Sequence, residues 1–350
     1  MLAEYVDSGK MDLCSGSNWG APVILFPKKD KGWRIVYDYR HLNSVTIKDR
    51  YPLPRIDDYL QQLTGASLFS AFDALDGFHQ LPMSPDSIEK TAVNTPLGSY
   101  VWKVMPMGLA NAPAAFQRMM NRIFGHLMYA KVYMDDILVH SSTVESHFQH
   151  LEEFLSVCAA NDIRLKASKC HFFYTNLEWI GFKIGNGQIT PTETLTDKIN
   201  RFPKPYTQKQ NLAFLGLCNF YRRFIDRYVE LSAPLVELNK KTYKQDFADY
   251  WNTECDQAFT QLRQALTSNP VLALYDPDLP TRVETDASNV GMGAVLTQCS
   301  HQKPAENKEW KPVEYYSRRW NSSQRNYHPS EKQTYAIVYA LQHWRHLLFG

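Results

Sequence analysis

Two adjacent carboxylates, Asp135 and Asp136, interrupt the apolar stretch KVYMDDILVH, which covers residues 131–140. An Asp pair in this position is typical of a turn between two strands, because Asp readily hydrogen-bonds its own backbone there. Successive side chains of a strand point to opposite faces, so one of the two aspartates can face a third carboxylate. Asp73, near the end of the apolar stretch SLFSAFDAL, is the candidate for that third carboxylate.

Carboxylates that lie within about 4 Å of one another repel and raise one another's pKa unless a cation lies between them. Mg²⁺ suits this position because it binds hard oxygen ligands and keeps coordination sites open for substrate phosphates. Two such ions can activate an attacking 3′-hydroxyl and stabilise the leaving pyrophosphate. The aspartates therefore indicate nucleotidyl transfer with two Mg²⁺ ions, and a plain hairpin turn is the alternative that they leave open.

The overall composition is that of a globular chain with a substantial core. Its 350 residues suffice for two or three domains, and 44% of them are hydrophobic. The net charge of +2 argues neither for nor against nucleic acid. Residues 201–245, however, carry nine basic and three acidic side chains, which suits a segment that binds phosphates. A solvated basic helix face is the alternative for this segment.

The cysteines and the apolar stretches indicate a chain that acts inside the cell without a membrane. None of the six cysteines is in a C-x-x-C pair or at zinc-binding spacing, so we expect free thiols in a reducing compartment. No signal peptide is recognisable, and no apolar run approaches the length of a membrane span.

Hydrophobic periodicity predicts a mixed α/β chain. Residues 21–26 and 33–37 are expected to form a hairpin whose polar tip carries Lys28, Lys29 and Lys31. A basic hairpin of this kind is ordinary surface, but mobile cations also suit a clamp for phosphates.

A helix is expected at residues 111–124, where Asn111 can cap the first turn and Pro113 fits inside it. Another is expected at residues 145–160. Its predicted apolar face consists of Phe148, Leu151, Leu155 and Cys158. The remaining predictions are helices at 208–225 and 254–266, three strands between residues 282 and 319, and a helix at 331–349.

The stretches FSAFDALDGFHQL, MPMGLANAPAAFQRMMN and YMDDILVHS together resemble the palm of reverse transcriptases. The flanking stretches APVILFPKKDKGWRIVYDYRHLN, IKDRYPLPRIDDYL and FLGLCNFYRRFI resemble the gypsy class of long-terminal-repeat retrotransposons. The likeness runs over nearly the whole chain, with the motifs in the usual order. It implies the right-hand polymerase fold, an α/β fold with an α+β palm, followed by a helical thumb and connection and a partial ribonuclease H-like βββα segment. The domains would be residues 1–190 for fingers and palm, 191–280 for thumb and connection, and 281–350 for the ribonuclease H-like segment.

The same resemblance implies roles for the aspartates. Asp73 and Asp135 would bind both Mg²⁺ ions, and Asp136 would be the more peripheral third carboxylate. Asp76 would stay outside the metal shell.

The nucleotide contacts implied by the resemblance are Lys28, Arg34, Phe78, Met107, Gly108, Gln117 and Lys169. Lys28 and Arg34 would clamp the triphosphate, with Lys29 or Lys31 in their place if the loop is shifted. Phe78 would act as a steric gate, because a flat ring under the sugar collides with a ribose 2′-hydroxyl and so favours deoxynucleotides. An aromatic ring that fills the core is the alternative for Phe78.

The other implied nucleotide contacts follow Phe78 in the chain. Gly108 would let the backbone pass close to the nucleotide, and Gln117 would line the template side. Met107 is a mild departure, because the family usually has an aromatic residue or glutamine there. Lys169 matches a lysine proposed to protonate the leaving pyrophosphate, with solvated surface as its alternative.

For the nucleic acid, the stretch LEWIGFKI resembles the primer grip, a hairpin that braces the primer end and includes Trp179 and Gly181. Arg222 and Arg223 would lie in the thumb or just after it, where backbone phosphates pass. The implied partners are an RNA or DNA template with its primer, dNTPs, and other parts of a retrotransposon polyprotein.

Residues 282–350 resemble the opening of a ribonuclease H domain, with Asp286 at the first metal-ligand position. Gln333 stands where the family has a catalytic Glu, and a neutral amide cannot supply the anionic oxygens that two Mg²⁺ ions need. Glu331 is two residues away, about 200° around a helix, and should point elsewhere. The chain also stops at Gly350, before the later acidic ligands. We therefore expect this segment not to cleave RNA.

The sequence supports an RNA-directed DNA polymerase best, and two other functions stay open. One is an RNA-synthesising viral polymerase with a similar palm, against which Phe78 and the flanking stretches speak. The other is a catalytically inactive, transposon-derived nucleic-acid-binding protein, which Gln333 favours. The complete set of palm aspartates favours retained polymerase chemistry.

Overall fold

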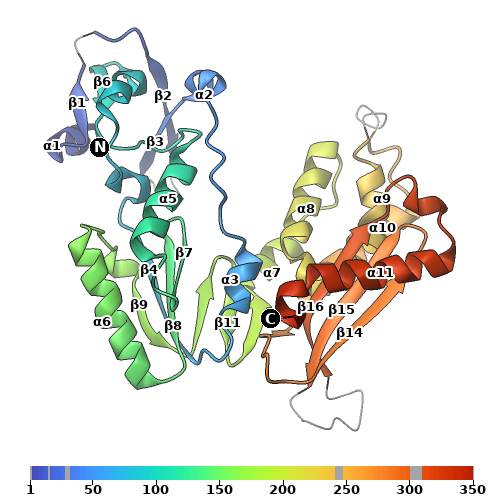
Figure 1. Cartoon of the computed structure of the whole chain (residues 1–350). Coiled ribbons are helices and arrows are strands. Elements are labelled where there is room, and N and C mark those ends of the chain that lie inside the picture. Colours follow the sequence, from blue (N-terminus) through green and yellow to red (C-terminus); the bar gives the residue numbers. More distant parts are fainter. Residues whose placement is uncertain (1, 15, 28–31, 241–246, 300–309, 350) are drawn as a thin grey trace. The chain divides into compact units, whose positions relative to one another are not determined.

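The computed structural model describes residues 2–14, 16–27, 32–240, 247–299 and 310–349 (Figure 1). The chain folds into two compact units, which are described separately here. The first unit comprises Met1–Tyr59 and Leu68–Tyr174, and the second comprises Leu60–Ser67 and Thr175–Gly350. Within the described residues, no helix combines the length and the apolar character needed to cross a bilayer.

Two sheets and the helices around them build the first unit (Figure 1). Its strands are β1 (Met11–Leu13), β2 (Ala21–Pro27), β3 (Trp33–Tyr37), β4 (Leu68–Asp73), β5 (Val93–Thr95), β6 (Gly98–Trp102), β7 (Ala130–Tyr133), β8 (Asp136–Ser141) and β9 (His171–Tyr174). Its helices are α1 (Leu2–Asp7), α2 (Arg40–Val45), α4 (Pro85–Ile88), α5 (Ala112–Phe124) and α6 (Val144–Ala160), with single 3₁₀ turns η1 (Gly77–Gln80), η2 (Glu89–Thr91) and η3 (Ala167–Lys169). Helix α3 (Ile56–Gln61) straddles the boundary between the units.

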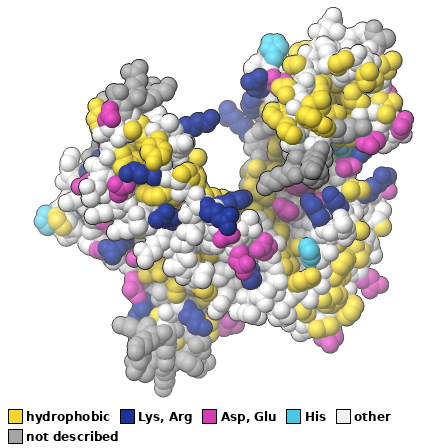
Figure 2. Space-filling model, turned by 180° about the vertical axis from the view of Figure 1, so that it is seen from behind, with side chains coloured by type: hydrophobic (Ala, Val, Ile, Leu, Met, Phe, Trp, Pro, Cys, Tyr) yellow, Lys and Arg dark blue, Asp and Glu magenta, His cyan; other side chains and the backbone are white. Residues whose placement is uncertain are grey.

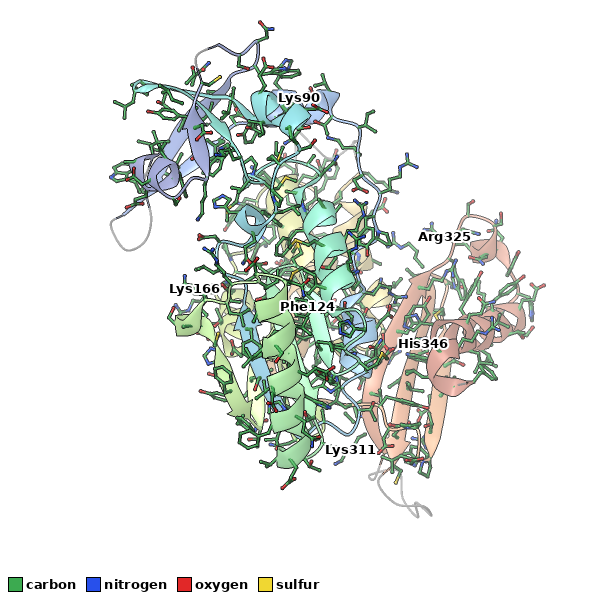
Figure 3. The ribbon with its side chains drawn as sticks, turned by 60° about the vertical axis from the view of Figure 1, so that its left-hand side comes forward. Lys90, Phe124, Lys166, Lys311, Arg325 and His346 are labelled. Atoms are coloured by element: carbon green, nitrogen blue, oxygen red, sulfur yellow. The ribbon has the colours of Figure 1, made fainter. Side chains whose placement is uncertain are left out.

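The strand order is β1-β6-β5-β2-β3 in one sheet and β7-β8-β4-β9 in the other. The predicted hairpin is confirmed, because β2 and β3 pair antiparallel. Helices α5 and α6 cover one face of the second sheet with a shared aromatic core (Figure 3). Within it, the rings of Phe72 and Phe124 lie 4.8 Å and 5.3 Å from that of Phe154. This apolar core holds in place the sheet whose strands β4 and β8 carry Asp73 and Asp136.

The details of α5 and α6 correct two predictions. Asn111 is the residue at the N-cap of α5, but its side chain does not cap the helix. It accepts a hydrogen bond from the Asp49 amide and donates one to the Ile47 carbonyl, and so it holds an upstream loop. In α6, Leu151 and Cys158 are buried as predicted, whereas Phe148 and Leu155 are exposed. The buried face runs instead through His147 and Phe154.

The second unit contains a four-stranded and a three-stranded antiparallel sheet. The strands are β10 (Asn176–Trp179), β11 (Phe182–Gly185), β12 (Gln188–Pro191), β13 (Leu272–Ala273), β14 (Thr281–Ala287), β15 (Gly291–Cys299) and β16 (Trp310–Arg319). The helices are α7 (Glu193–Asn200), α8 (Gln208–Phe220), α9 (Tyr228–Glu237), α10 (Thr253–Thr267), α11 (Pro329–His343) and α12 (Arg345–Leu348), with 3₁₀ turns η4 (Arg222–Phe224) and η7 (Gln324–Asn326).

The predicted βββα order near the end of the chain is confirmed by β14, β15, β16 and α11 (Figure 1). The last helix, predicted as continuous over 331–349, is broken at Trp344. The indole of Trp344 is buried and its Nε1 donates a hydrogen bond to Glu314 at 3.0 Å. Likewise, the predicted helix 208–225 ends at Phe220 and continues as the short turn η4.

Residues 60–67 pack with the second unit although they come early in the chain. Gln61 is hydrogen-bonded to His346 at 2.6 Å, and the Thr64 hydroxyl donates to the Tyr275 carbonyl. His346 is labelled in Figure 3. Leu60 is fully buried. The second unit is therefore assembled from two stretches that are distant in sequence.

Some large apolar side chains remain exposed. Figure 2 shows hydrophobic side chains, in yellow, that reach the surface in several places. Among the exposed ones in the β2–β3 hairpin are Leu25, Phe26 and Trp33. The hairpin thus buries only part of its apolar surface within this chain.

Candidate active site

The sheet of the first unit brings Asp73 opposite the Asp135–Asp136 pair. Strands β4 and β8 pair antiparallel, with Asp73 directly across from Asp136. Strand β7 pairs with β8 on its other side, and Tyr133 is the partner of Asp136 there. Asp73 and the Asp135–Asp136 pair therefore lie at the same end of two neighbouring strands. Asp135 and Asp136 thus belong to the β7–β8 hairpin and also lie near Asp73.

The turn that presents Asp135 is held from inside the protein. Met134 has a φ of 54°, a left-handed conformation that a non-glycine residue adopts only at a cost. The Oε1 atom of Gln117 accepts a hydrogen bond from the Met134 amide at 2.7 Å, and its Nε2 donates to the Val132 carbonyl at 2.8 Å. Because Gln117 is completely buried, its predicted place on the template side is corrected to a brace for the β7–β8 turn.

The charges at this site are unbalanced. Desolvation and the negative charges of Asp135 and Asp73 raise the pKa of Asp136 to about 6, although its side chain keeps access to solvent. Lys169 supplies a positive charge, since its Nζ lies 2.6 Å from Asp73 Oδ2. Asp76 is separate from this group and pairs with Lys10 at 2.5 Å.

The donor set fits magnesium chemically, but its side chains are not arranged as ligands. In the described part of the chain, no three or more His, Cys, Asp and Glu side chains are grouped so that they could hold a metal ion. Asp73 is turned to the Lys169 ammonium instead. Desolvation is the largest cause of the raised pKa of Asp136, and the negative charges of Asp135 and Asp73 add to it; a divalent cation would relieve this second cause.

Phe78 and Gly108 lie in the same unit. Phe78 is half-buried, and its ring packs edge-on against Phe116 at 5.5 Å, so it fills the core at least in part. Gly108 has a φ of 97°, which explains the glycine, and its carbonyl accepts a hydrogen bond from Asn43 at 2.8 Å. Met107, beside it, is exposed.

The predicted triphosphate clamp can be located only in part. Lys28, Lys29 and Lys31 lie outside the described residues. The backbone of Arg34 lies in β3, where it pairs with Phe26. The clamp therefore stays a prediction.

In the second unit, the predicted primer grip is the β10–β11 hairpin. Gly181 lies in its turn with a φ of 81°, and the Tyr221 hydroxyl donates to its carbonyl at 2.9 Å. A Cβ atom on Gly181 would lie 2.6 Å from that hydroxyl oxygen, so only glycine fits. Trp179 is 3% exposed, and its predicted contact with nucleic acid is corrected to a role inside the hairpin's core.

The two neighbouring arginines of η4 differ. Arg222 is exposed, as a phosphate-binding residue must be. Arg223 is 5% exposed, and its positive charge helps to keep the buried Glu314 ionised. Its predicted role is therefore corrected to an internal electrostatic one.

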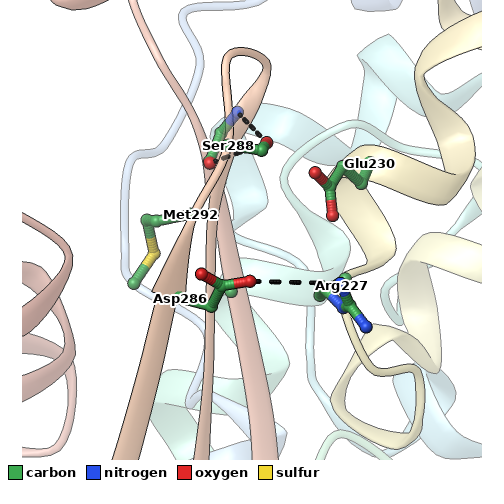
Figure 4. Close-up of a pocket in the computed structure, with 7 residues that line it drawn as sticks. Arg227, Glu230, Asp286, Ser288 and Met292 are labelled. Atoms are coloured by element: carbon green, nitrogen blue, oxygen red, sulfur yellow. Dashed lines mark hydrogen bonds and ion pairs between the residues drawn. The ribbon is translucent and has the colours of Figure 1, made fainter. Parts of the chain in front are cut away.

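Asp286, the predicted ribonuclease H ligand, has a cationic neighbour, Arg227, which Figure 4 shows beside it. Arg227 of the α9 N-cap lies 4.0 Å from Asp286 Oδ2, and Gln333 Nε2 donates to Oδ1 at 3.3 Å. Glu230 lines the same small pocket. Gln333 thus occupies the predicted position, and Glu331 bonds the His328 amide at the start of α11 instead.

Sequence reasoning missed three contributors to these sites: Lys10, Arg227 and the bracing role of Gln117. Only Gln117 left a usable signal, since a glutamine in an otherwise apolar helical stretch must satisfy its amide when buried. Lys10 and Arg227 are far from their partners in the chain. Only the tertiary fold brings them there.

Comparison with family models matches two parts of the chain. Residues 26–184 match "Reverse transcriptase (RNA-dependent DNA polymerase)", and residues 251–350 match "RNase H-like domain found in reverse transcriptase".

Two curated relatives cover nearly all of this chain. The "Retrovirus-related Pol polyprotein from transposon 297" of Drosophila melanogaster is 36% identical over 343 residues, which are 96% of this chain and 31% of that protein. The "Transposon Tf2-3 polyprotein" of Schizosaccharomyces pombe is 35% identical over 329 residues, which are 93% of this chain and 24% of that protein. The chain thus spans less than a third of either polyprotein.

Solved structures of similar fold include the foamy viral protease-reverse transcriptase. In its complex with dsDNA, the match has a TM-score of 0.84 at 25% identity and covers 100% of this chain and 71% of that chain. The form named dRH, in complex with ds DNA, also matches with a TM-score of 0.84 at 25% identity and covers 99% of this chain and 59% of that one.

Proposed function

Because the chain belongs to the reverse transcriptases of retrotransposon Pol polyproteins, with a reverse transcriptase domain over residues 26–184, we propose that it is an RNA-directed DNA polymerase that extends a primer with dNTPs. The single observation that carries this proposal is the convergence of Asp73, Asp135 and Asp136 at adjoining strand ends. The negative charges of Asp135 and Asp73, which together with desolvation raise the pKa of Asp136, support a site for divalent cations.

In this proposal Asp73 and Asp135 would hold two Mg²⁺ ions, with Asp136 as the outer carboxylate. When bound, the ions would activate the primer 3′-hydroxyl and stabilise the leaving pyrophosphate. The Lys169 ammonium would move away from Asp73 and protonate the leaving pyrophosphate. Such an exchange needs little movement, because Lys169 is exposed and only its tip bonds Asp73.

Gln117 would position the chemistry without touching the substrate. Its two hydrogen bonds to the backbone of the β7–β8 turn fix the strained Met134 and thereby the direction of Asp135. Preorganisation of this kind matters because catalytic groups misplaced by about 1 Å can lose about 100-fold in rate. Phe78 would exclude the ribose 2′-hydroxyl with the part of its ring that the core leaves exposed.

We also propose that the ribonuclease H-like segment does not cleave RNA. Gln333 stands where a metal-binding carboxylate would be needed. Its neutral amide donates a hydrogen bond to Asp286 instead. Arg227, whose guanidinium is shared with Asp226, adds positive charge beside Asp286, which disfavours a second cation there. Incubation of the chain with an RNA/DNA hybrid and Mg²⁺ should leave the RNA strand intact. Cleavage that disappears in Asp286→Asn would contradict this.

The foamy viral relatives are complexes with dsDNA and with an RNA/DNA hybrid, which supports a primed template as the partner of this chain. The test is primer extension by the purified chain with an RNA template, a DNA primer and Mg²⁺. We expect incorporation of deoxynucleotides, no incorporation of ribonucleotides, and loss of extension in Asp135→Asn.

Two outcomes would overturn the proposal. Preferential use of ribonucleotides would indicate an RNA-synthesising polymerase. Binding of primer–template without any incorporation would indicate a nucleic-acid-binding protein that has lost its chemistry.

A further inference from the structure

Phe78, the proposed steric gate, lies in the 3₁₀ turn η1, which starts in a strained conformation. Asp76, at the N-cap of η1, has a φ of 59°, and the following Gly77 has a φ of 44°. A left-handed conformation at Asp76 costs free energy and persists only where surrounding contacts hold it. Gly77 also lies close to the catalytic turn, because a Cβ atom added to it would be 3.8 Å from Asp135 Cβ. The position of the Phe78 ring therefore depends on what holds η1.

The side chain of Gln80, the last residue of η1, attaches the turn to the backbone with three hydrogen bonds. Its Nε2 donates to the Leu75 carbonyl at 2.7 Å and to the Arg164 carbonyl at 2.9 Å. Its Oε1 accepts from the Arg164 amide at 2.9 Å. The carboxamide thus bonds both backbone groups of Arg164, as the backbone of a neighbouring strand would. Glutamine supplies the two donors and the acceptor that this arrangement uses.

The backbone segments that Gln80 bonds also hold the strand end that presents Asp73. The Leu75 amide donates to the Arg164 carbonyl at 2.8 Å. The amide of Lys166, which is labelled in Figure 3, donates to the Asp73 carbonyl at 2.9 Å. The segment 164–166 therefore runs beside the end of β4, and Gln80 bonds to both. The turn that carries the gate and the carboxylate proposed to bind the metal ions share one hydrogen-bonded frame.

The other attachments of η1 lead toward the other sheet of the first unit. Asp76 pairs with Lys10, which directly precedes β1, and the ring of His79 lies 4.9 Å from that of Trp102 in β6. The Lys10–Asp76 pair is partly exposed, and exposed ion pairs contribute little to stability. The contact of His79 with Trp102 is ring packing, which is less directional than a hydrogen bond. Gln80 thus supplies the directional link from η1 to the end of β4.

We infer that Gln80 is a positioning residue for sugar selection, which fixes the Phe78 ring at the distance from the aspartates that excludes a ribose 2′-hydroxyl. This role rests on the proposed function, in which Phe78 is the gate, and it adds a residue that touches no substrate. A gate that rejects by steric clash needs a fixed position, because a ring that can withdraw slightly accommodates the extra oxygen. Gln80 thereby determines the preference for deoxynucleotides while it leaves the metal ligands in place.

The test measures kcat/KM for a single incorporation of a dNTP and of the matching rNTP by the full chain on an RNA template with a DNA primer. Gln80→Met keeps the length of the side chain and removes its amide. It should lower the ratio of the dNTP value to the rNTP value about tenfold, because misplacement by about 1 Å changes rates about 100-fold and this turn should move by less. The fall should come mainly from faster ribonucleotide incorporation.

Gln80→Glu is the second variant, in case Gln80→Met does not fold. It keeps the acceptor for the Arg164 amide, but an ionised carboxylate cannot donate to the two carbonyls. It should lower the ratio in the same direction. A wild-type ratio in a folded Gln80→Glu chain would overturn the inference.

Gln298→Met is the matched control in the second unit. The Nε2 of Gln298 donates to the Asp276 carbonyl at 2.6 Å and to the Thr281 hydroxyl at 2.9 Å. Its Oε1 accepts from the Asp276 amide at 2.9 Å, so Gln298 bonds both backbone groups of one residue, as Gln80 does. Its loss should destabilise the chain without a change in the ratio. An equal fall of the ratio in Gln298→Met and Gln80→Met would make the effect one of general stability and would overturn the inference.

The double variant Phe78→Ala/Gln80→Met tests whether Gln80 acts through the ring. Phe78→Ala alone should lower the ratio further than Gln80→Met does, because it removes the gate. Gln80→Met should then have no additional effect, since no ring remains to be positioned. Independent effects of the two substitutions would show that Gln80 acts by another route and would overturn the inference. All variants are compared at a temperature at which circular dichroism shows them folded.

Failure of the inference can be told apart from failure of the proposed function. If the wild-type chain prefers dNTPs and only Phe78→Ala relaxes that preference, the inference fails and the polymerase proposal stands. If Phe78→Ala leaves the ratio unchanged, the proposed gate fails and the role of Gln80 falls with it. If the wild-type chain incorporates no nucleotide at all, the polymerase proposal fails, and the inference fails with it.

Discussion

The two acidic sites of the molecule start from similar residues and end with different partners. At the first, three carboxylates, Asp73, Asp135 and Asp136, share the ammonium of Lys169, which leaves 3 − 1 = 2 negative charges unmatched. At the second, Asp286 has an amide partner in Gln333 and shares the Arg227 guanidinium with Asp226, while Glu230 lines the same pocket. A carboxylate at the end of a strand therefore says little by itself. The charge that surrounds it decides whether a divalent cation is needed.

The largest expected effect is the loss of polymerase activity in Asp73→Asn, with Asp286→Asn as its counterpart at the second site. Removal of a metal ligand should lower the rate of primer extension about 1000-fold, because bound metal ions supply several kcal/mol of transition-state stabilisation. Asp286→Asn should extend primers at the wild-type rate.

Single-turnover extension at saturating dNTP measures both variants. A similar loss in Asp286→Asn would break the comparison, since it would place both carboxylates in one catalytic process.

A buried carboxylate of the second unit sharpens the contrast. Burial opposes the ionisation of Glu314, but hydrogen bonds from His343 and Trp344 and the positive charge of Arg223 outweigh it and lower its pKa to about 2. Because this pKa is below the ordinary value, the folded state binds fewer protons than the unfolded state, and stability rises with pH. The contribution, about 3 kcal/mol, should be complete above pH 5 and be lost as pH falls toward 2.

Urea unfolding of the chain, followed by tryptophan fluorescence between neutral and acidic pH, measures this dependence. Glu314→Gln should be less stable at neutral pH and should show a flatter response to acid. An unchanged response in this variant would mean that Glu314 is not ionised in the folded state.

The smallest expected effect separates support of the site from support of the fold. Gln117 in the first unit and Gln298 in the second are both buried glutamines. The side-chain amide of each donates to one backbone carbonyl and accepts from one backbone N–H. Replacement of either by Leu should lower the free energy of unfolding by about 2 kcal/mol, because buried backbone groups lose their partners. Only Gln117→Leu should also slow extension, by about tenfold, since it alone frees the turn that carries Asp135.

Extension is measured at a temperature where both variants remain folded, so that stability and activity are separated. If Gln298→Leu slows extension as much as Gln117→Leu does, the effect of Gln117 is only structural.

The order of helices and strands was accessible from the sequence because their patterns are local. The apolar stretches 21–26 and 33–37 predicted β2 and β3, and hydrophobic periodicity predicted α10, whose buried face includes Cys255, Phe259, Leu262 and Leu266. The meeting of Asp73 with Asp136 was also accessible, because both residues lie next to strong apolar stretches. Local chemistry was enough for these features.

What the sequence did not reveal depends on distant partners. Arg222 and Arg223 are identical in type and adjacent, yet one is exposed and the other faces buried Glu314. Trp179 could have been a surface ring or a core ring, and only the fold of the hairpin places it inside. In α6, the buried face is rotated from the predicted one and includes His147. The hydroxyls of Ser70 and Ser141 are hydrogen-bonded to its two ring nitrogens and so offset the cost of burying the imidazole.

The short stretch 60–67 has a consequence for how the protein is made. It leaves the ribosome before its partners, because Thr64 and Gln61 bond Tyr275 and His346, which are translated 211 and 285 residues later. Until then, Leu60 and its neighbours have no completed unit to join. Ribosomes add roughly 5–20 residues per second, so Leu60 and Leu63, which are buried in the finished fold, wait for about ten seconds or more. Residues Thr175–Gly350 therefore cannot complete the second unit without Leu60–Ser67.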